Sequence, residues 1–60
     1  MKILVVEDEL YAREALIRQI QQYDQDGHFR ILEAANGEEG LNIFRAERPE
    51  FLMTDIRMPR

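Results

Sequence analysis

The chain has 60 residues, a formal net charge of -4 from 12 acidic and 8 basic side chains, and no cysteine. Its length excludes two domains and limits the core to a modest size, while the lack of cysteine excludes disulfides and thiolate metal sites and fits a reducing compartment such as the cytoplasm. The acidic balance argues against a nucleic-acid-binding surface on these residues, and the longest apolar run, residues 3–6, is too short for a signal peptide or a membrane span.

The first two predicted elements are a strand and a helix. Residues 2–7 (KILVVE) contain an apolar run without polar alternation, which is typical of a strand buried on both faces. From residue 10 to about residue 23, apolar side chains recur at spacings of three and four and polar ones take the other side, which predicts an amphipathic helix. Asp8 or Glu9 is a suitable N-cap, and residues 24–27 supply a stop and a turn.

Three further elements complete the predicted order. Residues 29–34 indicate a second strand. Asn36 is a good N-cap with Glu39 three places later, the spacing of a capping box, so a second helix begins here. Pro49 ends this helix at the preceding residue, and residues 51–55 (FLMTD) form the third predicted strand.

Strands and helices therefore alternate along the whole chain, which indicates the α/β class. Such alternation predicts a parallel sheet with right-handed crossovers and helices on its faces. The sequence shows no internal repeat, no low-complexity tract and no linker to a second domain. The third strand is apolar and needs a neighbour and a cover, so we expect residues 1–60 to form part of a larger domain.

Carboxylates follow two of the predicted strands. Glu7 and Asp8 follow the first strand, and Asp55 ends the third. In an open α/β sheet, ligands bind beyond the carboxyl ends of the strands. If the first and third strands are neighbours, these side chains converge and repel one another. Mg²⁺ prefers oxygen ligands and would relieve that repulsion, so the pattern predicts a magnesium site.

A cation at this position would also allow Asp55 to act as a nucleophile. The metal would screen the repulsion between the carboxylate and an incoming anionic phosphoryl group, and aspartyl phosphates are an established class of covalent intermediate. An acidic pair after a strand is more often only a helix cap, and a lone Asp before a loop is usually a turn residue. The joint pattern of Glu7, Asp8 and Asp55 at matching strand ends favours the chemical interpretation.

Three segments carry a resemblance to a known family: KILVVEDE at residues 2–9, EAANGEEGL at residues 33–41 and MTDIRMP at residues 53–59. In order and spacing they resemble the bacterial two-component response-regulator receiver domain of the CheY-like superfamily. The resemblance covers nearly all 60 residues but about half of a full receiver. It implies a flavodoxin-like parallel sheet, the βαβαβ half of a doubly wound receiver with strand order 2-1-3. Residues 1–60 would then be a partial receiver domain, with the remaining strands and helices and any output domain absent.

The resemblance also implies a role for each matching residue. Asp55 is expected to be the phosphoacceptor, charged by the phosphohistidine of a partner sensor histidine kinase. Asp8 is expected to bind Mg²⁺ directly, Glu7 mainly through a water, and Arg57 through its backbone carbonyl. Glu7 departs from the commoner Asp, and its extra methylene could shift the metal affinity. Pro59 is expected to shape the loop after the phosphorylation site.

The family also uses residues that have no match here. A Ser or Thr at the end of the fourth strand contacts the phosphoryl group, and a Lys at the end of the fifth pairs with it. The chain has no Ser, its single Thr is Thr54 on the third strand, and its single Lys is Lys2 at the far end of the first. We therefore expect the isolated residues to accept phosphoryl poorly and not to act as an enzyme. Their bare third strand is expected to drive homo-oligomer formation.

Rival functions remain open at this point. The chain could be a truncated or engineered half-domain that acts only as a self-associating structural module. A phosphohydrolase of the haloacid dehalogenase type also forms an aspartyl phosphate, but it typically needs a second Asp two places after the nucleophile, where this chain has Arg57. No Gly-rich nucleotide-binding motif is present. By analogy with the family, the output is control of transcription through a DNA-binding output domain beyond these residues.

Overall fold

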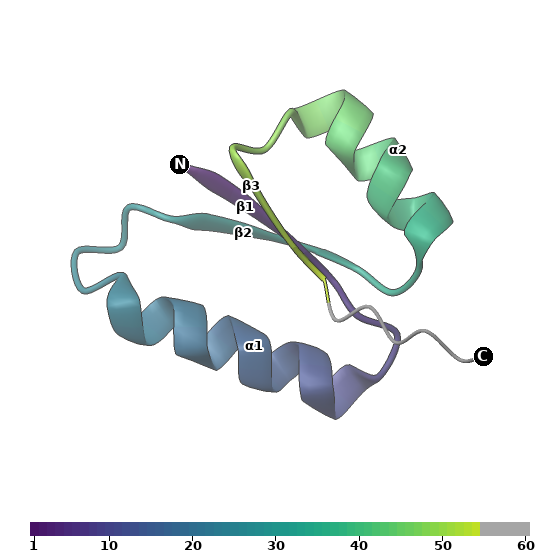
Figure 1. Ribbon diagram of the computed structural model, residues 1–60. Coiled ribbons are helices and arrows are strands. Elements are labelled where there is room, and N and C mark those ends of the chain that lie inside the picture. The colour runs from purple at the N-terminus through teal and green to yellow at the C-terminus, as the bar shows by residue number, and fades with distance from the viewer. Residues whose placement is uncertain (55–60) are drawn as a thin grey trace.

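The structure is a computed structural model that describes residues 1–54. These residues form a three-stranded parallel sheet with a helix on each face (Figure 1). The elements in chain order are β1 (Lys2–Val6), α1 (Leu10–Tyr23), β2 (Arg30–Ala34), α2 (Gly37–Glu47) and β3 (Phe51–Thr54). The predicted α/β class and βαβαβ order are confirmed. Asp55, the last residue of the predicted third strand, lies outside the described residues.

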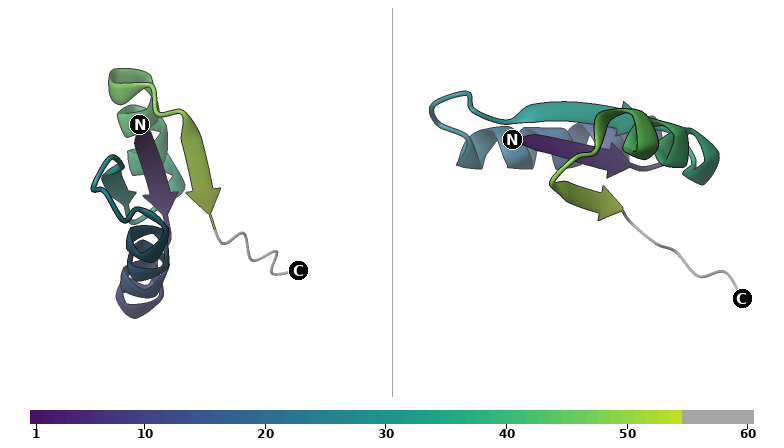
Figure 2. Two further views of the ribbon diagram at one scale, coloured as in Figure 1. Left: turned by 90° about the vertical axis from the view of Figure 1, so that its left-hand side faces the viewer. Right: turned by 90° about the horizontal axis from the view of Figure 1, so that it is seen from above.

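β1 is the central strand of the sheet. The order is β2-β1-β3 and both pairings are parallel, so the predicted order 2-1-3 is confirmed. Val6 is the register partner of both Ala34 on β2 and Thr54 on β3. All three strands therefore reach the same rim of the sheet at their carboxyl ends, as the parallel arrowheads of β1 and β3 show (Figure 2).

Both faces of β1 are covered, which explains its unbroken apolar run. Leu4 and Val5 are 1% and 0% exposed. Ile3 and Val5 form a buried cluster with Ile20 of α1, whereas α2 packs on the opposite face, the one that Leu4 presents. Burial of side chains of this size stabilises a fold by about 1.5–3 kcal/mol each, so this strand dominates the core.

Each helix begins at a side-chain cap. Glu9 is the N-cap of α1, and its Oε1 accepts a hydrogen bond from the backbone N–H of Ala12 at 2.8 Å. Asn36 caps α2, and its Oδ1 accepts a hydrogen bond from the backbone N–H of Glu39 at 2.8 Å. In return, Oε1 of Glu39 accepts a hydrogen bond from the backbone N–H of Ala35 at 2.6 Å. The predicted capping box is thus present, although its return bond reaches the residue before the cap. Neither helix of residues 1–54 has the length and apolarity needed to cross a membrane.

Gly40 lets α2 lie close to the central strand. A Cβ at this position would lie 2.9 Å from Cγ2 of Val6 and 3.7 Å from the Cβ of Ala34. The first distance is shorter than carbon atoms tolerate, and the β-branched Val6 side chain has little freedom to move aside. The helix therefore needs a residue without a side chain here.

Lys2 ties the connection between α2 and β3 to the start of β1, at the rim opposite the acidic pair. Its Nζ lies 3.0 Å from Oε1 of Glu47 in a half-buried ion pair, and its backbone N–H donates to Oε1 of Glu50 at 2.8 Å. The hydrogen bond and charge of the Lys2 ammonium lower the pKa of Glu47 below its ordinary value of 4.5. The backbone N–H of Lys2 likewise lowers the pKa of Glu50.

Replacing Gly40 with Ala should destabilise the fold. Overpacking costs about 1–3 kcal/mol and the better helix propensity of Ala returns about 1 kcal/mol, so we expect the free energy of unfolding to fall by about 1 kcal/mol. Gly37→Ala is the matched control, because a Cβ there meets nothing within 4 Å. Urea unfolding of both variants checks this, and equal stability of the two would show that close approach at Gly40 is not required.

The Lys2–Glu47 ion pair should make stability depend on pH in the acid range. Because the folded pKa of Glu47 is lowered, its contribution is fully present above 4.5 and is lost as the pH falls through the lower folded pKa. In Lys2→Met, the melting temperature should therefore fall less steeply as the pH is lowered below 4.5. Some fall should remain, because the backbone N–H of residue 2 still bonds Glu50. Arg45→Met, which removes an exposed cation of α2, should leave the acid limb of the profile unchanged.

Candidate functional site

The carboxyl ends of β1 and β3 meet at one rim of the sheet. Val6 and Thr54 are register partners on neighbouring parallel strands, so Glu7 follows β1 at the rim where β3 also ends. The prediction that the first and third strands are neighbours is confirmed. Asp55 and Arg57 lie outside the described residues, as does Pro59, and their predicted roles stay predictions.

Glu7 is a buried carboxylate directly after the central strand. It is 3% exposed, and its backbone N–H continues the sheet by donating to the carbonyl of Ala34 at 3.0 Å. Its Oε2 accepts a hydrogen bond from the N–H of Glu9 at 2.8 Å. Its Oε1 is buried and has no hydrogen-bond partner within residues 1–54. A buried acceptor without a donor is costly, so this oxygen is suited to a ligand that supplies positive charge.

Asp8 is the exposed partner of Glu7. It lies in the bend between β1 and α1, where its carboxylate is accessible to solvent. Two adjacent carboxylates, one buried and one exposed, are the kind of oxygen donor that Mg²⁺ accepts. Within residues 1–54 no group of three or more His, Cys, Asp or Glu side chains is placed to hold a metal. The two side chains therefore fit part of a magnesium site, and the third predicted carboxylate is Asp55.

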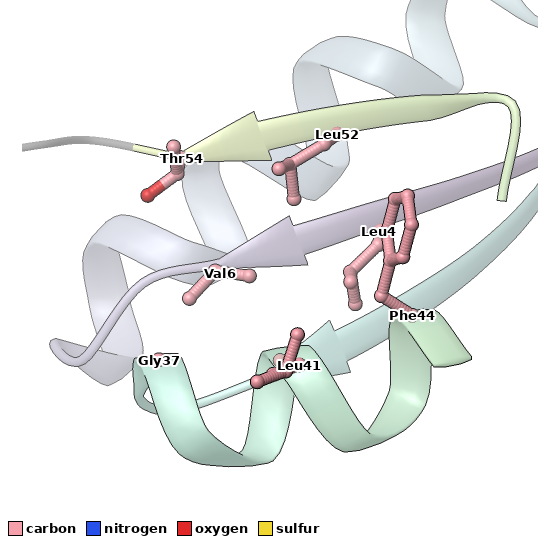
Figure 3. Close-up of a pocket in the computed structure, with 8 residues that line it drawn as sticks. Leu4, Val6, Gly37, Leu41, Phe44, Leu52 and Thr54 are labelled. Atoms are coloured by element: carbon pink, nitrogen blue, oxygen red, sulfur yellow. The ribbon is translucent and has the colours of Figure 1, made fainter. Parts of the chain in front are cut away.

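Two hollows border this part of the sheet, and among the described lining residues only one of them has a charged side chain. A hollow of about 350 Å³ between α1 and β3 includes Glu7 and Thr54 in its lining. The larger hollow, about 390 Å³, lies on the α2 face and is almost wholly apolar (Figure 3). Its lining residues are Leu4, Val6, Gly37, Gly40, Leu41, Phe44, Leu52 and Thr54. Among the described residues its single polar side chain is the Thr54 hydroxyl, so residues 1–54 supply this groove with no carboxylate, histidine or other charged side chain.

Arg13 is a residue of the site that the sequence analysis missed. The periodicity placed it on the polar side of the first helix, yet its side chain is only 16% exposed. Its Nη1 donates to the backbone carbonyl of Glu7 at 2.9 Å, and its Nε donates to Oε1 of Glu33 at 3.1 Å. The signal available in the sequence was a cation one turn into a helix that follows three consecutive acidic residues, Glu7 to Glu9.

Comparison with known proteins gives one family and several relatives. The family model described as "Response regulator receiver domain" matches residues 3–60. The positive alginate biosynthesis regulatory protein of Pseudomonas aeruginosa is 44% identical over 61 residues, which cover 98% of this chain and 23% of that protein. The probable transcriptional regulator ycf27 of Cyanophora paradoxa is 37% identical over 59 residues, again 98% and 23% of the two chains.

A third relative comes from another bacterium. An uncharacterized response regulatory protein of Staphylococcus epidermidis is 38% identical over 60 residues, covering 98% of this chain and 23% of that protein. This chain thus spans about a quarter of the length of the relatives that it matches. No solved structure gives a significant match.

Proposed function

This chain belongs to the response regulator receiver domain family, and we propose that it accepts a phosphoryl group on Asp55 from a partner sensor histidine kinase, with Mg²⁺ as cofactor. Receiver domains are generally signalling modules and not enzymes, and the phosphohydrolase alternative gains no support from the family match. The observation that carries the proposal is the pairing of Val6 with Thr54, which brings the acidic pair and the end of β3 to one rim.

The proposed transfer makes one bond and breaks one. A carboxylate oxygen of Asp55 attacks phosphorus, the bond from phosphorus to the kinase histidine nitrogen breaks, and the histidine leaves with its electron pair. Glu7, Asp8 and Asp55, with the backbone carbonyl of Arg57, are the proposed ligands of Mg²⁺. When bound, Mg²⁺ supplies positive charge that lowers the repulsion between carboxylate and phosphoryl oxygens.

We also propose that the whole protein controls transcription. Relatives that match nearly all of this chain carry names of transcriptional and biosynthetic regulators, and each is about four times longer than the matched segment. A DNA-binding output domain outside residues 1–60 would translate phosphorylation into a change in transcription. Such a system acts in the cytoplasm, where its kinase domain and DNA are both accessible.

Phosphorylation of Asp55 is the direct test. We expect the whole protein that contains residues 1–60, incubated with Mg²⁺ and an acyl phosphate donor, to gain the mass of one phosphoryl group, whereas isolated residues 1–60 should gain it poorly. Hydroxylamine should remove this group, because it cleaves acyl phosphates and leaves phosphate esters of Thr54 or tyrosine intact. Asp55→Asn should abolish the gain, since an amide cannot form the acyl phosphate.

The controls separate the site from general effects of charge. Asp26→Asn, at an exposed turn position, should be phosphorylated like the unaltered protein, whereas Asp8→Asn should need more Mg²⁺ for the same extent of reaction. A phosphoryl group that survives hydroxylamine, or that persists in Asp55→Asn, would contradict the proposal.

A second proposal concerns self-association through β3. Among residues 1–54, β1 is the single strand neighbour of β3, and Phe51, Leu52 and Met53 are 57%, 54% and 42% exposed. Exposed apolar edges pair readily with another chain. The other edge strand, β2, carries two exposed charged residues, which discourage such pairing. We propose that residues 1–60, when isolated from any further part of the domain, form an isologous dimer by pairing β3 with β3 of a second copy.

Sedimentation velocity over a range of concentrations tests the dimer. Leu52→Lys should weaken self-association by about tenfold or more, because a charged edge residue opposes strand addition. Tyr11→Lys is the control, since Tyr11 is 75% exposed on α1 and away from the edge. A monomer at every concentration, or equal association of the two variants, would refute the pairing.

A further inference from the structure

We infer that Arg13 is a positioning residue for the cation site: it holds the loop that carries Glu7 and Asp8, and the affinity for Mg²⁺ depends on its two-pronged contact. The inference rests on the proposed function, in which Glu7 and Asp8 are ligands of that cation. It assigns a task to a side chain that the phosphoryl transfer itself does not use.

The contacts of Arg13 link three elements at the rim where β1 and β3 end. The guanidinium belongs to α1, its Nη1 bonds the carbonyl of Glu7 at the end of β1, and its Nε bonds the carboxylate of Glu33 on β2. The backbone N–H of Arg13 also donates to the carbonyl of Glu9 at 2.9 Å. Arg13 therefore holds both ends of the loop: its side chain bonds Glu7 and its backbone N–H bonds Glu9.

Other bonds also fix this loop. Oε2 of Glu7 accepts from the N–H of Glu9, and Oε1 of Glu9 caps α1. The backbone N–H of Glu7 joins the first residue of the loop to the carbonyl of Ala34 on β2. The Arg13 bridge to Glu33 adds a second link to β2, through a side chain. Groups that orient metal ligands without touching the metal commonly change affinity by about 10–100-fold when they are removed.

The charge of Arg13 and its hydrogen bonds to the loop should change the affinity for a cation in opposite directions. A guanidinium near the site repels a divalent cation, so loss of charge alone would tighten binding. Loss of the fixed carbonyl contact would loosen the loop and weaken binding. Arg13→Lys keeps the charge but loses the planar fork that reaches two acceptors, and Arg13→Gln loses both. The sign of the change in affinity therefore tells which effect operates.

The experiment is a Mg²⁺ titration followed by the NMR shifts of the Glu7, Asp8 and Glu9 amides, which reports binding without any phosphoryl transfer. We expect both Arg13→Lys and Arg13→Gln to bind Mg²⁺ about tenfold more weakly. Hydrogen exchange of the Glu9 amide should be faster in both, even without metal. Arg18→Lys and Arg18→Gln are the matched controls, because Arg18 lies on the same helix, is 71% exposed and has only a 4.0 Å contact with Glu14.

Each outcome bears on a different claim. Unchanged or tighter Mg²⁺ binding by the Arg13 variants, with normal binding by the unaltered protein, would overturn the role of Arg13 and leave the proposed function standing. No response of the unaltered protein to Mg²⁺ would overturn both. If Arg13→Gln fails to fold, Glu33→Gln decides: it keeps the bond to Glu7 but removes the ionic anchor, and we expect about twofold to threefold weaker binding, whereas unchanged affinity would refute the bridge.

Discussion

The burial of β1 between two strands and two helices is the constraint from which the remaining arrangement follows. Leu4 and Val5 are almost fully enclosed, one facing each helix, so the strand cannot shift by one residue without exchanging its two faces. The register of β2 and β3 is set against it. Gly40 then allows α2 to pack directly over the end of this strand, where any side chain would meet Val6.

The two rims of the sheet differ in how the carboxylates beside them are satisfied. At the amino end of β1, Lys2 satisfies the carboxylates of Glu47 and Glu50. At the carboxyl end, Glu7 keeps a buried oxygen without a donor among residues 1–54. Carboxylates that are paired with a cation contribute stability, whereas an unsatisfied buried one costs it. The unsatisfied oxygen therefore lies at the rim where β1 and β3 both end.

Arg13 links α1 to the loop after β1 and to β2. Its guanidinium is shared between a backbone carbonyl of the loop and a carboxylate of β2. A planar donor with several N–H groups suits two acceptors held at fixed positions, which a lysine ammonium cannot serve in the same way. The loop that presents Asp8 to solvent is thereby joined to α1 and to the sheet.

The sequence by itself determined the order of elements, both bounds of α1, the capping role of Asn36 and the strand order, because these depend on local periodicity, short-range hydrogen bonds and the resemblance to a family. For α1 it left Asp8 and Glu9 as alternative caps, and the structure shows that Glu9 is the cap. The roles of Asp55 and Arg57 remain sequence-based predictions. Only the tertiary structure decided that Arg13 contacts the rim and that one oxygen of Glu7 is buried with no donor among residues 1–54. Those facts depend on how α1 and β2 pack against β1, and the periodic pattern along the chain does not encode that packing.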